Sequence, residues 1–441
     1  MPLKVNKIDQ YIVYFAIFFP IAIVIGPGVA DLNLVIICLL FLLICFSYKE
    51  MFISKKILLL LFFINLYFIF CSLLSNNILF SLQSSLFYFR FSIFTIAMLY
   101  ILKSNKNFII YFTYVIFFTT FLISIDSIIE FITSYSFINL FIENNYSTTG
   151  RISGIFGNEY ILGSYLVRSL PLIIGLVIYL KDIIKINKKI MFFYLVSIST
   201  AIFVSGERTA IFMLLLIYFL GFIFIKEYLK QILLFILLSV LILTFLIFKD
   251  SNFKKRVFDK TINDIFITSK HDNFISDKSN LNSIKFYRLN FFSVQHEVVY
   301  NTAYKIIKDY PLFGIGPKMF RIMCKNEEYR SYTQFDRSVN GCQTHPHNTY
   351  IQMFVETGIF GFIIIILFYF FIFLKYLKNL LIHRRSKISG LKYLEVFCLI
   401  NILINLWPLM PTGNFFNNWL SAMYYLPLPF LLYSFKTINN N

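Results

Sequence analysis

The sequence is poor in acidic residues, with 22 Asp and Glu against 40 Lys and Arg in a chain of 441 residues. Hydrophobic residues make up 58% of the chain and aromatic residues 20%, which leaves too few polar side chains to cover a water-soluble fold of this length. These shortages exclude an ordinary soluble protein. The composition therefore predicts an integral membrane protein.

The chain also lacks an internal repeat, a low-complexity linker and a soluble domain at either end, so we expect one integral domain over residues 1–441. Its first apolar stretch follows Lys4 and Lys7 and has no small-residue cleavage site. We therefore expect this stretch to be a membrane span and not a cleaved signal peptide.

Apolar stretches long enough to cross a bilayer recur along the chain, because a spanning helix needs about 20 mostly apolar residues. They predict an all-α membrane protein of about 12 transmembrane helices: nine in residues 1–248, a large partly helical loop at 249–348, and three in residues 349–441. The predicted spans are 10–30, 32–48, 56–75, 81–102, 108–133, 160–180, 190–205, 208–225, 230–248, 349–374, 391–410 and 416–436.

The cationic residues are distributed asymmetrically between the two sides of these spans. If the N-terminus is cytoplasmic, the inside segments hold 20 Lys and Arg, whereas the five short outside loops hold only Arg151 and Arg208. An excess of cations on the cytoplasmic side is typical of membrane proteins. It predicts cytoplasmic termini, places the large loop outside, and explains the formal charge of +18 without nucleic-acid binding.

The large loop is predicted to be partly ordered. Apolar residues recur at helical spacing from Val294 to Ile307, and Pro311 ends the pattern, whereas residues 254–282 are polar and are expected to be irregular. Cys324 and Cys342 both fall in this loop, where an oxidising compartment would allow a disulfide. Their spacing is equally compatible with two free thiols.

Two histidines stand at the point where the loop re-enters the membrane. His345 and His347 lie in the sequence THPHNTY, directly before the tenth predicted span. A histidine there can titrate near neutral pH and accept a proton from a hydroxyl group. The alternative is that one of them only caps the tenth predicted span or binds a lipid headgroup, which we favour for His345 but not for His347. A zinc site has little support, because no third ligand is evident.

Arginine residues form the second candidate site. Arg90 and Arg168 lie inside predicted spans, about 12 Å below the outer surface at roughly 1.5 Å per residue. Arg151 and Arg208 lie in outside loops, so the four guanidinium groups can converge, and such groups suit phosphate and diphosphate oxygens. Buried cations also serve as structural ion pairs. The acidic partners available in the outer halves of spans are Asp126, Glu130 and Glu356.

These residues resemble the motifs of the O-antigen ligase and polymerase superfamily of bacterial membrane glycosyltransferases. His347 and Asn348, followed by Gly358 and Gly361, match its histidine motif. The resemblance extends to residues 205–210 (SGERTA), 151–154 (RISG) and 309–317 (DYPLFGIGP). We assign the small residues of the last segment a backbone role only.

The resemblance implies a GT-C-like fold, a bacterial inner-membrane location with a periplasmic loop, and transfer of a glycan from a polyprenyl-diphosphate carrier without metal or cofactor. His347 would be the base on the acceptor hydroxyl and Arg208 a diphosphate ligand, with Arg151, Arg90 and Arg168 as further ligands. His345, Asn348, Glu356 and Asp126 would have supporting roles.

The acceptor stays open at this point. Ligases deliver the glycan to lipid A-core, whereas polymerases deliver it to another carrier-linked repeat. We favour a ligase because the histidine motif is of the ligase type. A multi-span transporter of lipid or glycan is the alternative outside enzymes, although the chain shows no inverted repeat and its unusual residues lie towards one face.

Overall fold

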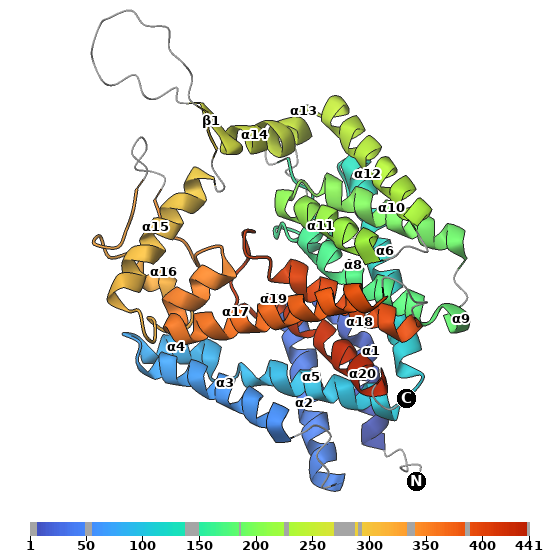
Figure 1. Ribbon diagram of the computed structural model, residues 1–441, viewed down its shortest axis with the longest axis horizontal. Coiled ribbons are helices and arrows are strands. Elements are labelled where there is room, and N and C mark those ends of the chain that lie inside the picture. Colours follow the sequence, from blue (N-terminus) through green and yellow to red (C-terminus); the bar gives the residue numbers. More distant parts are fainter. Residues whose placement is uncertain are drawn as a thin grey trace, which may run out of the picture.

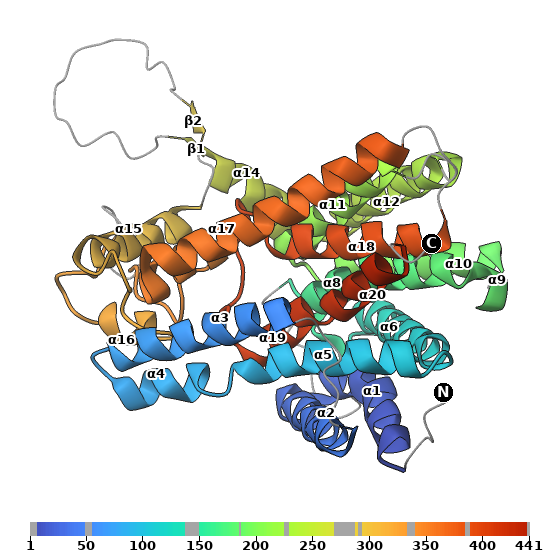
Figure 2. The ribbon, with the colours of Figure 1, turned by 60° about the horizontal axis from the view of Figure 1, so that its bottom comes forward.

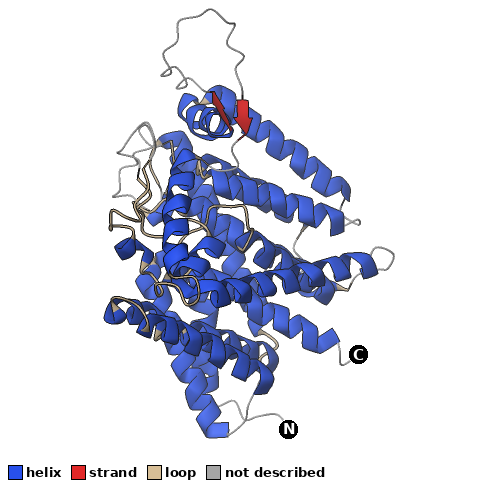
Figure 3. Cartoon of the chain, turned by 60° about the vertical axis from the view of Figure 1, so that its left-hand side comes forward, coloured by secondary structure: helices blue, strands red, loops and turns tan. Residues whose placement is uncertain are grey.

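The computed structural model describes residues 7–48, 55–136, 150–184, 187–224, 229–268, 287–289, 293–332, 340–383 and 389–438. These parts are almost entirely helical (Figures 1 and 3). The two strands described, β1 (Phe266–Thr268) and β2 (Tyr287–Leu289), form a short antiparallel hairpin. The all-α class predicted from the sequence is therefore confirmed apart from this hairpin.

Each of the twelve predicted spans corresponds to a helix or to a pair of helices. The first nine spans correspond to α1 (Lys7–Ile25), α2 (Pro27–Tyr48), α3 (Lys55–Leu73), α4 (Ile78–Ser85) with α5 (Phe89–Ser104), α6 (Phe108–Thr133), α8 (Leu162–Tyr179), α10 (Lys188–Val204), α11 (Arg208–Phe224) and α12 (Leu229–Lys249). The last three are α17 (Thr349–His383), α18 (Gly390–Asn405) and α19 (Asn418–Tyr425) with α20 (Pro427–Ile438).

Within the residues that the structure describes, some of these helices are long and apolar enough to cross a membrane. Six are long and apolar enough, and a seventh counts if α12 and the segment after it, which meet at 104°, form one broken span. The six are Lys7–Ile25, Pro27–Ser47, Ile78–Ser104, Phe108–Thr133, Leu162–Tyr179 and Thr349–Ile382. The chain thus carries multiple apolar helices of membrane type, and twelve crossings stay a prediction.

The helices begin at polar residues that interrupt the apolar runs. Asn77, Asn187 and Asn417 precede α4, α10 and α19, and the side chain of each accepts a backbone N–H from the first turn. Such a cap satisfies one of the donors that a helix leaves unpaired at its N-terminus. Polar clusters between apolar runs therefore set the boundaries of these elements.

The centre of the bundle is α18, every residue of which from Tyr393 to Asn405 is buried. It packs most extensively against α8 and also contacts α20, α17 and α11 (Figure 1). Helices at the periphery expose large apolar side chains, among them Phe62 and Phe63 of α3 and Phe370 and Phe371 of α17. An apolar surface around an apolar core is the pattern of a protein surrounded by lipid.

The segment that follows α12 is ordered, and the expectation of an irregular chain over residues 254–282 was wrong for its first part. Residues 251–265 form the short helix α13 (Ser251–Phe253), the π-helical η3 (Lys254–Asp259) and α14 (Lys260–Ile265). We call residues 251–265 the bent segment. Exposed Phe258 and Ile262 with buried Phe253 make it amphipathic, a pattern that its many charges concealed. The rest of the expected irregular stretch, from residue 269, lies outside the described residues up to β2.

The remainder of the predicted loop forms two helices, α15 (Val294–Asp309) and α16 (Phe320–Met323). The helix predicted from residue 294 is confirmed and ends before Pro311. Both helices lie at the end of the molecule opposite to the one where α1 begins and α20 ends (Figure 2). The candidate site residues between residues 293 and 349 thus gather at one end of the bundle.

Candidate active site

The two histidines of the THPHNTY sequence are held by the chain between α18 and α19. The His347 carbonyl accepts a hydrogen bond from the Thr412 N–H at 2.8 Å, and the His345 Nε2 lies 3.1 Å from the Thr412 carbonyl oxygen. His345 is buried, whereas His347 is half-buried. One threonine therefore fixes the turn from both sides and leaves the His347 ring partly accessible.

A third histidine joins this pair. The ring of His345 lies 4.2 Å from that of His347, and the ring of His296 on α15 lies 5.6 Å from His347 on an approximately perpendicular plane. Ser293 Oγ lies 2.7 Å from the Nδ1 of His296 and orients that ring. His296 was missed in the sequence because it lies about fifty positions before His347. Only its place on the polar side of an amphipathic helix pointed to it.

Burial keeps these imidazoles neutral. It lowers the pKa of His347 to about 4, with a smaller contribution from His296, and it lowers the pKa of His345 to about 3, with a smaller contribution from His347. A ring with such a pKa is unprotonated at neutral pH. His347 is therefore in the form that can accept a proton.

Asn348 and Glu356 support the histidine turn from α17. The Asn348 Oδ1 accepts hydrogen bonds from the Tyr350 and Ile351 N–H groups, and its Nδ2 donates to the Pro408 carbonyl at 2.7 Å. Glu356 is fully buried and accepts hydrogen bonds from Gln352 and from the Phe320 N–H. These contacts anchor the start of α17 to its neighbours, which is a structural task.

The glycines of the histidine motif mark a break in α17. Gly358 has a φ of 67°, and a Cβ there would meet the Leu312 carbonyl oxygen closer than real Cβ atoms approach. The Ile359 N–H, freed by this break, donates to the Pro311 carbonyl at 2.9 Å, and the Ile315 N–H donates to the Val355 carbonyl at 3.0 Å. The backbone of the segment 309–317 thus packs against the break in α17 and forms hydrogen bonds with it, which agrees with the backbone role assigned to the small residues of this segment.

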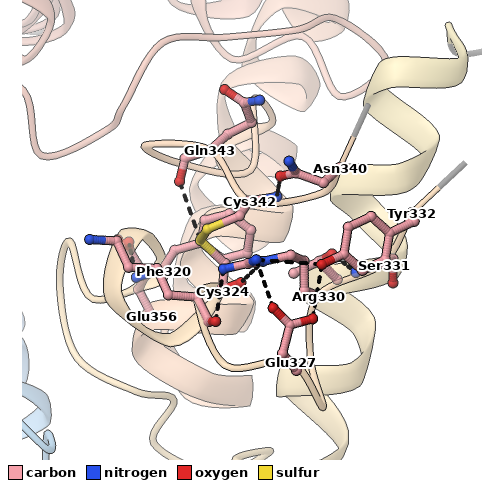
Figure 4. Close-up of a disulfide and its surroundings, with 12 residues drawn as sticks. Phe320, Cys324, Glu327, Arg330, Ser331, Tyr332, Asn340, Cys342, Gln343 and Glu356 are labelled. Atoms are coloured by element: carbon pink, nitrogen blue, oxygen red, sulfur yellow. Dashed lines mark hydrogen bonds and ion pairs between the residues drawn. A yellow bond between two sulfur atoms is a disulfide. The ribbon is translucent and has the colours of Figure 1, made fainter. Parts of the chain in front are cut away.

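A disulfide between Cys324 and Cys342 ties α16 to the chain that leads into the histidine turn (Figure 4). Its two Cα atoms are 4.9 Å apart. Arg330 folds over the bridge, where its Nε donates to the Cys324 carbonyl and its Nη1 pairs with Glu327 at 2.8 Å. The bridge leaves only two residues, Gln343 and Thr344, between the disulfide and His345.

Two of the predicted arginines meet in a second cluster. Arg151 lies 3.9 Å from Glu207 and donates to the Tyr160 carbonyl at 2.6 Å, while Arg208 donates to Thr261 Oγ1 at 3.5 Å. Burial raises the pKa of Glu207 to about 7, and Arg151 opposes this effect. Arg256 of the bent segment completes the cluster through a 3.1 Å hydrogen bond from its Nε to the Gly206 carbonyl. The sequence did not single out Arg256 among the many cations of the long loop.

The other two arginines have partners that the sequence did not predict. Arg90, which follows the interruption between α4 and α5, forms an ion pair with Asp31 at 2.9 Å. Arg168 is buried, donates hydrogen bonds to Ser164 and Asn405, and lies over the Tyr424 ring.

Asp126 and Glu130 instead lie beside the RISG segment. Asp126 Oδ2 accepts a hydrogen bond from Ser136, and Glu130 accepts one from the Gly154 N–H. Gly154 has a φ of 58°, and a Cβ there would lie 3.2 Å from the Ser127 hydroxyl oxygen. Glu130 therefore contacts the loop that carries Arg151, and direct pairing of these acids with the arginines stays a prediction.

A continuous set of contacts joins the arginine cluster to the histidine turn. Glu207 accepts the Gly163 N–H at 2.8 Å at the start of α8, the helix that carries Arg168. Arg168 lies over the Tyr424 ring, the Tyr424 hydroxyl lies near Thr349 without a hydrogen bond to it, and Thr349 Oγ1 lies 2.9 Å from Thr412 Oγ1. The two candidate sites are thus linked by contacts through α8 and Tyr424. Among the residues that the structure describes, no three His, Cys, Asp or Glu side chains are placed to hold a metal ion.

Residues 193–366 match the protein-family model described as O-Antigen ligase. This region of the chain is similar to O-antigen ligases. The resemblance to the O-antigen ligase and polymerase superfamily is thereby confirmed. A search of the curated proteins finds no match to the chain. Within the family domain lie His347, His296, Arg208 and Arg256, whereas Arg151 and Arg168 precede it.

Proposed function

We propose that this protein transfers a glycan from a polyprenyl-diphosphate carrier to an acceptor hydroxyl, as an O-antigen ligase with lipid A-core as acceptor. The observation that carries the proposal is the neutral, partly accessible His347, linked through α8 and Tyr424 to a cluster of guanidinium groups. A base for a hydroxyl and cations for a diphosphate are the two groups that this transfer needs.

In the proposed reaction, His347 takes the proton of the acceptor hydroxyl as its oxygen attacks the anomeric carbon of the glycan. The bond from this carbon to the diphosphate breaks, the anomeric configuration inverts, and the electron pair leaves with the polyprenyl diphosphate. Arg208 and Arg151 stabilise the negative charge that grows on the leaving group, because guanidinium groups bind such oxygens in pairs. No metal takes part in this scheme.

The proposed setting is the bacterial inner membrane, with twelve spans, cytoplasmic termini and a periplasmic loop at residues 249–348. Two observations support this setting. The described helices expose apolar side chains on their outer surfaces, and the disulfide lies in the loop that would face an oxidising compartment. The carrier tail would then lie in the bilayer while its diphosphate reaches the arginine cluster.

The test is transfer in vitro from a purified polyprenyl-diphosphate glycan. Lipid A-core and a carrier-linked single repeat are offered as separate acceptors, with His347→Ala and His347→Gln beside the wild-type protein. Loss of the base should lower the rate by about 10²-fold or more. The matched control is Tyr304→Ala, an exposed residue on α15 that should keep wild-type activity.

The product identifies the acceptor class. A product on lipid A-core alone supports the ligase, whereas a ladder of carrier-linked products supports a polysaccharide polymerase. If His347→Ala keeps wild-type transfer, the proposed base is wrong. If the wild-type protein forms no product with either acceptor, a transporter of lipid or glycan becomes the better hypothesis.

A further inference from the structure

Arg256 reaches the arginine cluster from an element that no sequence motif marks. Its Nε donates to the carbonyl of Gly206, the residue two positions before Arg208. Its guanidinium lies within electrostatic range of both Arg151 and Arg208. Three guanidinium groups from three separate parts of the chain thus meet in one place, beside the single carboxylate of Glu207.

Two glycines allow this close approach. A Cβ on Gly206 would collide with the Gly150 carbonyl oxygen, and a Cβ on Gly150 would lie 3.3 Å from the Asn252 carbonyl oxygen and 3.5 Å from the Arg256 Cβ. Both glycines also have a positive φ, of 66° and 61°. The Asn252 backbone and the Arg256 side chain are therefore packed against Gly150, and Gly150 is packed against Gly206, which brings the segments that carry the three arginines together.

The bent segment also has an outward face. It leaves α12 at an angle of 104°, so it lies across the end of that helix (Figure 1). Phe258 and Ile262, four positions apart, are 45% and 40% exposed, whereas Phe253 is fully buried. A helix with exposed apolar residues on one side and a cation directed inward suits the boundary between lipid and water.

We infer that Arg256 is a third guanidinium ligand of the donor, held at the membrane boundary so that it binds the diphosphate of a lipid carrier. The inference rests on the proposed function, because it assigns this ligand to the same donor. A diphosphate carries two anionic groups and more oxygens than one guanidinium fork can satisfy. Three guanidinium groups can bind both phosphates, whereas a monophosphate uses only part of the cluster.

The experiment measures binding of undecaprenyl diphosphate and undecaprenyl monophosphate to the purified full-length protein in nanodiscs, by native mass spectrometry. Arg256→Ala and Arg256→Lys are compared with the wild-type protein and with Lys255→Ala, the adjacent exposed cation. Arg208→Lys serves as the comparison for a ligand already assigned. Arg256→Lys keeps a donor for the Gly206 carbonyl but loses the fork, which separates ligand binding from support of the loop.

We expect both Arg256 variants to weaken binding of the diphosphate lipid by about tenfold or more and binding of the monophosphate lipid less. Both variants should therefore lose the wild-type preference for the diphosphate lipid, whereas Lys255→Ala should keep it. Wild-type preference in both Arg256 variants, together with its loss in Arg208→Lys, would overturn the inference and leave the proposed function standing. A wild-type protein that binds neither lipid would contradict both. Equal weakening of both lipids in Arg256→Lys would indicate a loop-supporting residue and would also overturn the inference.

Discussion

His347 occupies a backbone conformation that residues other than glycine rarely adopt, with a φ of 57°. Such a conformation costs on the order of 1 kcal/mol or more and persists only where its surroundings fix it. Here the surroundings are Thr412, which bonds to the His347 carbonyl, and His345, which bonds to Thr412 in turn. His345 thus contacts the threonine that holds the His347 carbonyl, and its supporting role stays a prediction.

The lowered pKa of His347 gives a prediction about pH. A base with a pKa of about 4 stays unprotonated at pH 5.5, where an ordinary histidine is about 90% protonated. We therefore expect kcat/KM for glycan transfer to hold from pH 7 to pH 5.5 and to fall only as the pH approaches about 4. The measurement is a pH profile of initial rates with the wild-type enzyme.

Protein stability has to be measured beside that profile. The unfolded chain takes up a proton on His347 near pH 6.5, but the folded protein does so only near pH 4, so the folded state loses stability as the pH falls through this window. Rates are therefore normalised to the folded fraction at each pH. An acid limb centred near 6.5 in the normalised rates would show that His347 is not the buried base described here.

Residues of the candidate site could be predicted only where a local pattern marked them. His347 and Arg208 stand in short motifs at predicted membrane boundaries. By contrast, the approach of His296 to His347 and the Arg90–Asp31 ion pair join residues 51 and 59 positions apart. The partner of such a contact depends on how the helices pack, which neither hydropathy nor charge distribution specifies.

At the scale of elements, the break in α17 is the feature that brings the histidine turn and the segment 309–317 together. We expect Gly358→Ala to destabilise the protein, because the added Cβ meets the Leu312 carbonyl and the φ of 67° disfavours alanine. The loss should exceed about 1–2 kcal/mol, the cost of the left-handed conformation alone. It should appear as a lower melting temperature in detergent and as weaker transfer activity.

A second glycine provides the control for that change. Gly221 lies within α11, and a Cβ there meets no heavy atom within 4 Å. Gly221→Ala should therefore leave the melting temperature unchanged or raise it, because alanine favours the helix by about 1 kcal/mol over glycine. Equal behaviour of the two variants would mean that the break in α17 is not a required feature of the fold.

Helix positions were predictable and helix interruptions were not. Apolar runs located all twelve helical segments, because burial in lipid or protein requires a continuous stretch of apolar residues. The same runs continue through Tyr88, between α4 and α5, and through Leu426, between α19 and α20. Interruptions of this kind depend on local packing and do not change the hydropathy of the sequence. The bent segment was missed for the opposite reason, since its charges outweigh its few apolar residues.

For the whole molecule, the arrangement of the ends agrees with the distribution of charge. The start of α1 and the end of α20 lie at the end of the bundle away from α15 and α16 (Figure 2). The lysine-rich connection before α10 lies with them, as shown by α9 (Lys181–Ile184) in Figures 1 and 2. This arrangement favours an odd number of crossings between residue 181 and residue 308, although α10 has only 17 residues.

The crossings between those positions can be tested with two substituted cysteines. Lys181 and Lys308 are both exposed, so Lys181→Cys and Lys308→Cys can be labelled with a membrane-impermeant maleimide in intact and in permeabilised cells. We expect Lys308→Cys to react in intact cells and Lys181→Cys to react only after permeabilisation. The native Cys38, Cys71 and Cys398 are buried and should contribute little background.

The 17 residues of α10 span about 26 Å, a few Å less than the hydrocarbon core of about 30 Å, so the test bears most directly on this helix. If both cysteines react from the same side, one of the three helices between them does not cross. If only Lys181→Cys reacts in intact cells, the orientation is reversed, and α15 with the His347 turn would face the cytoplasm. In that case the Cys324–Cys342 bridge would lie on the cytoplasmic side and not in an oxidising compartment. The bent segment would then lie at the inner leaflet and not at the outer one.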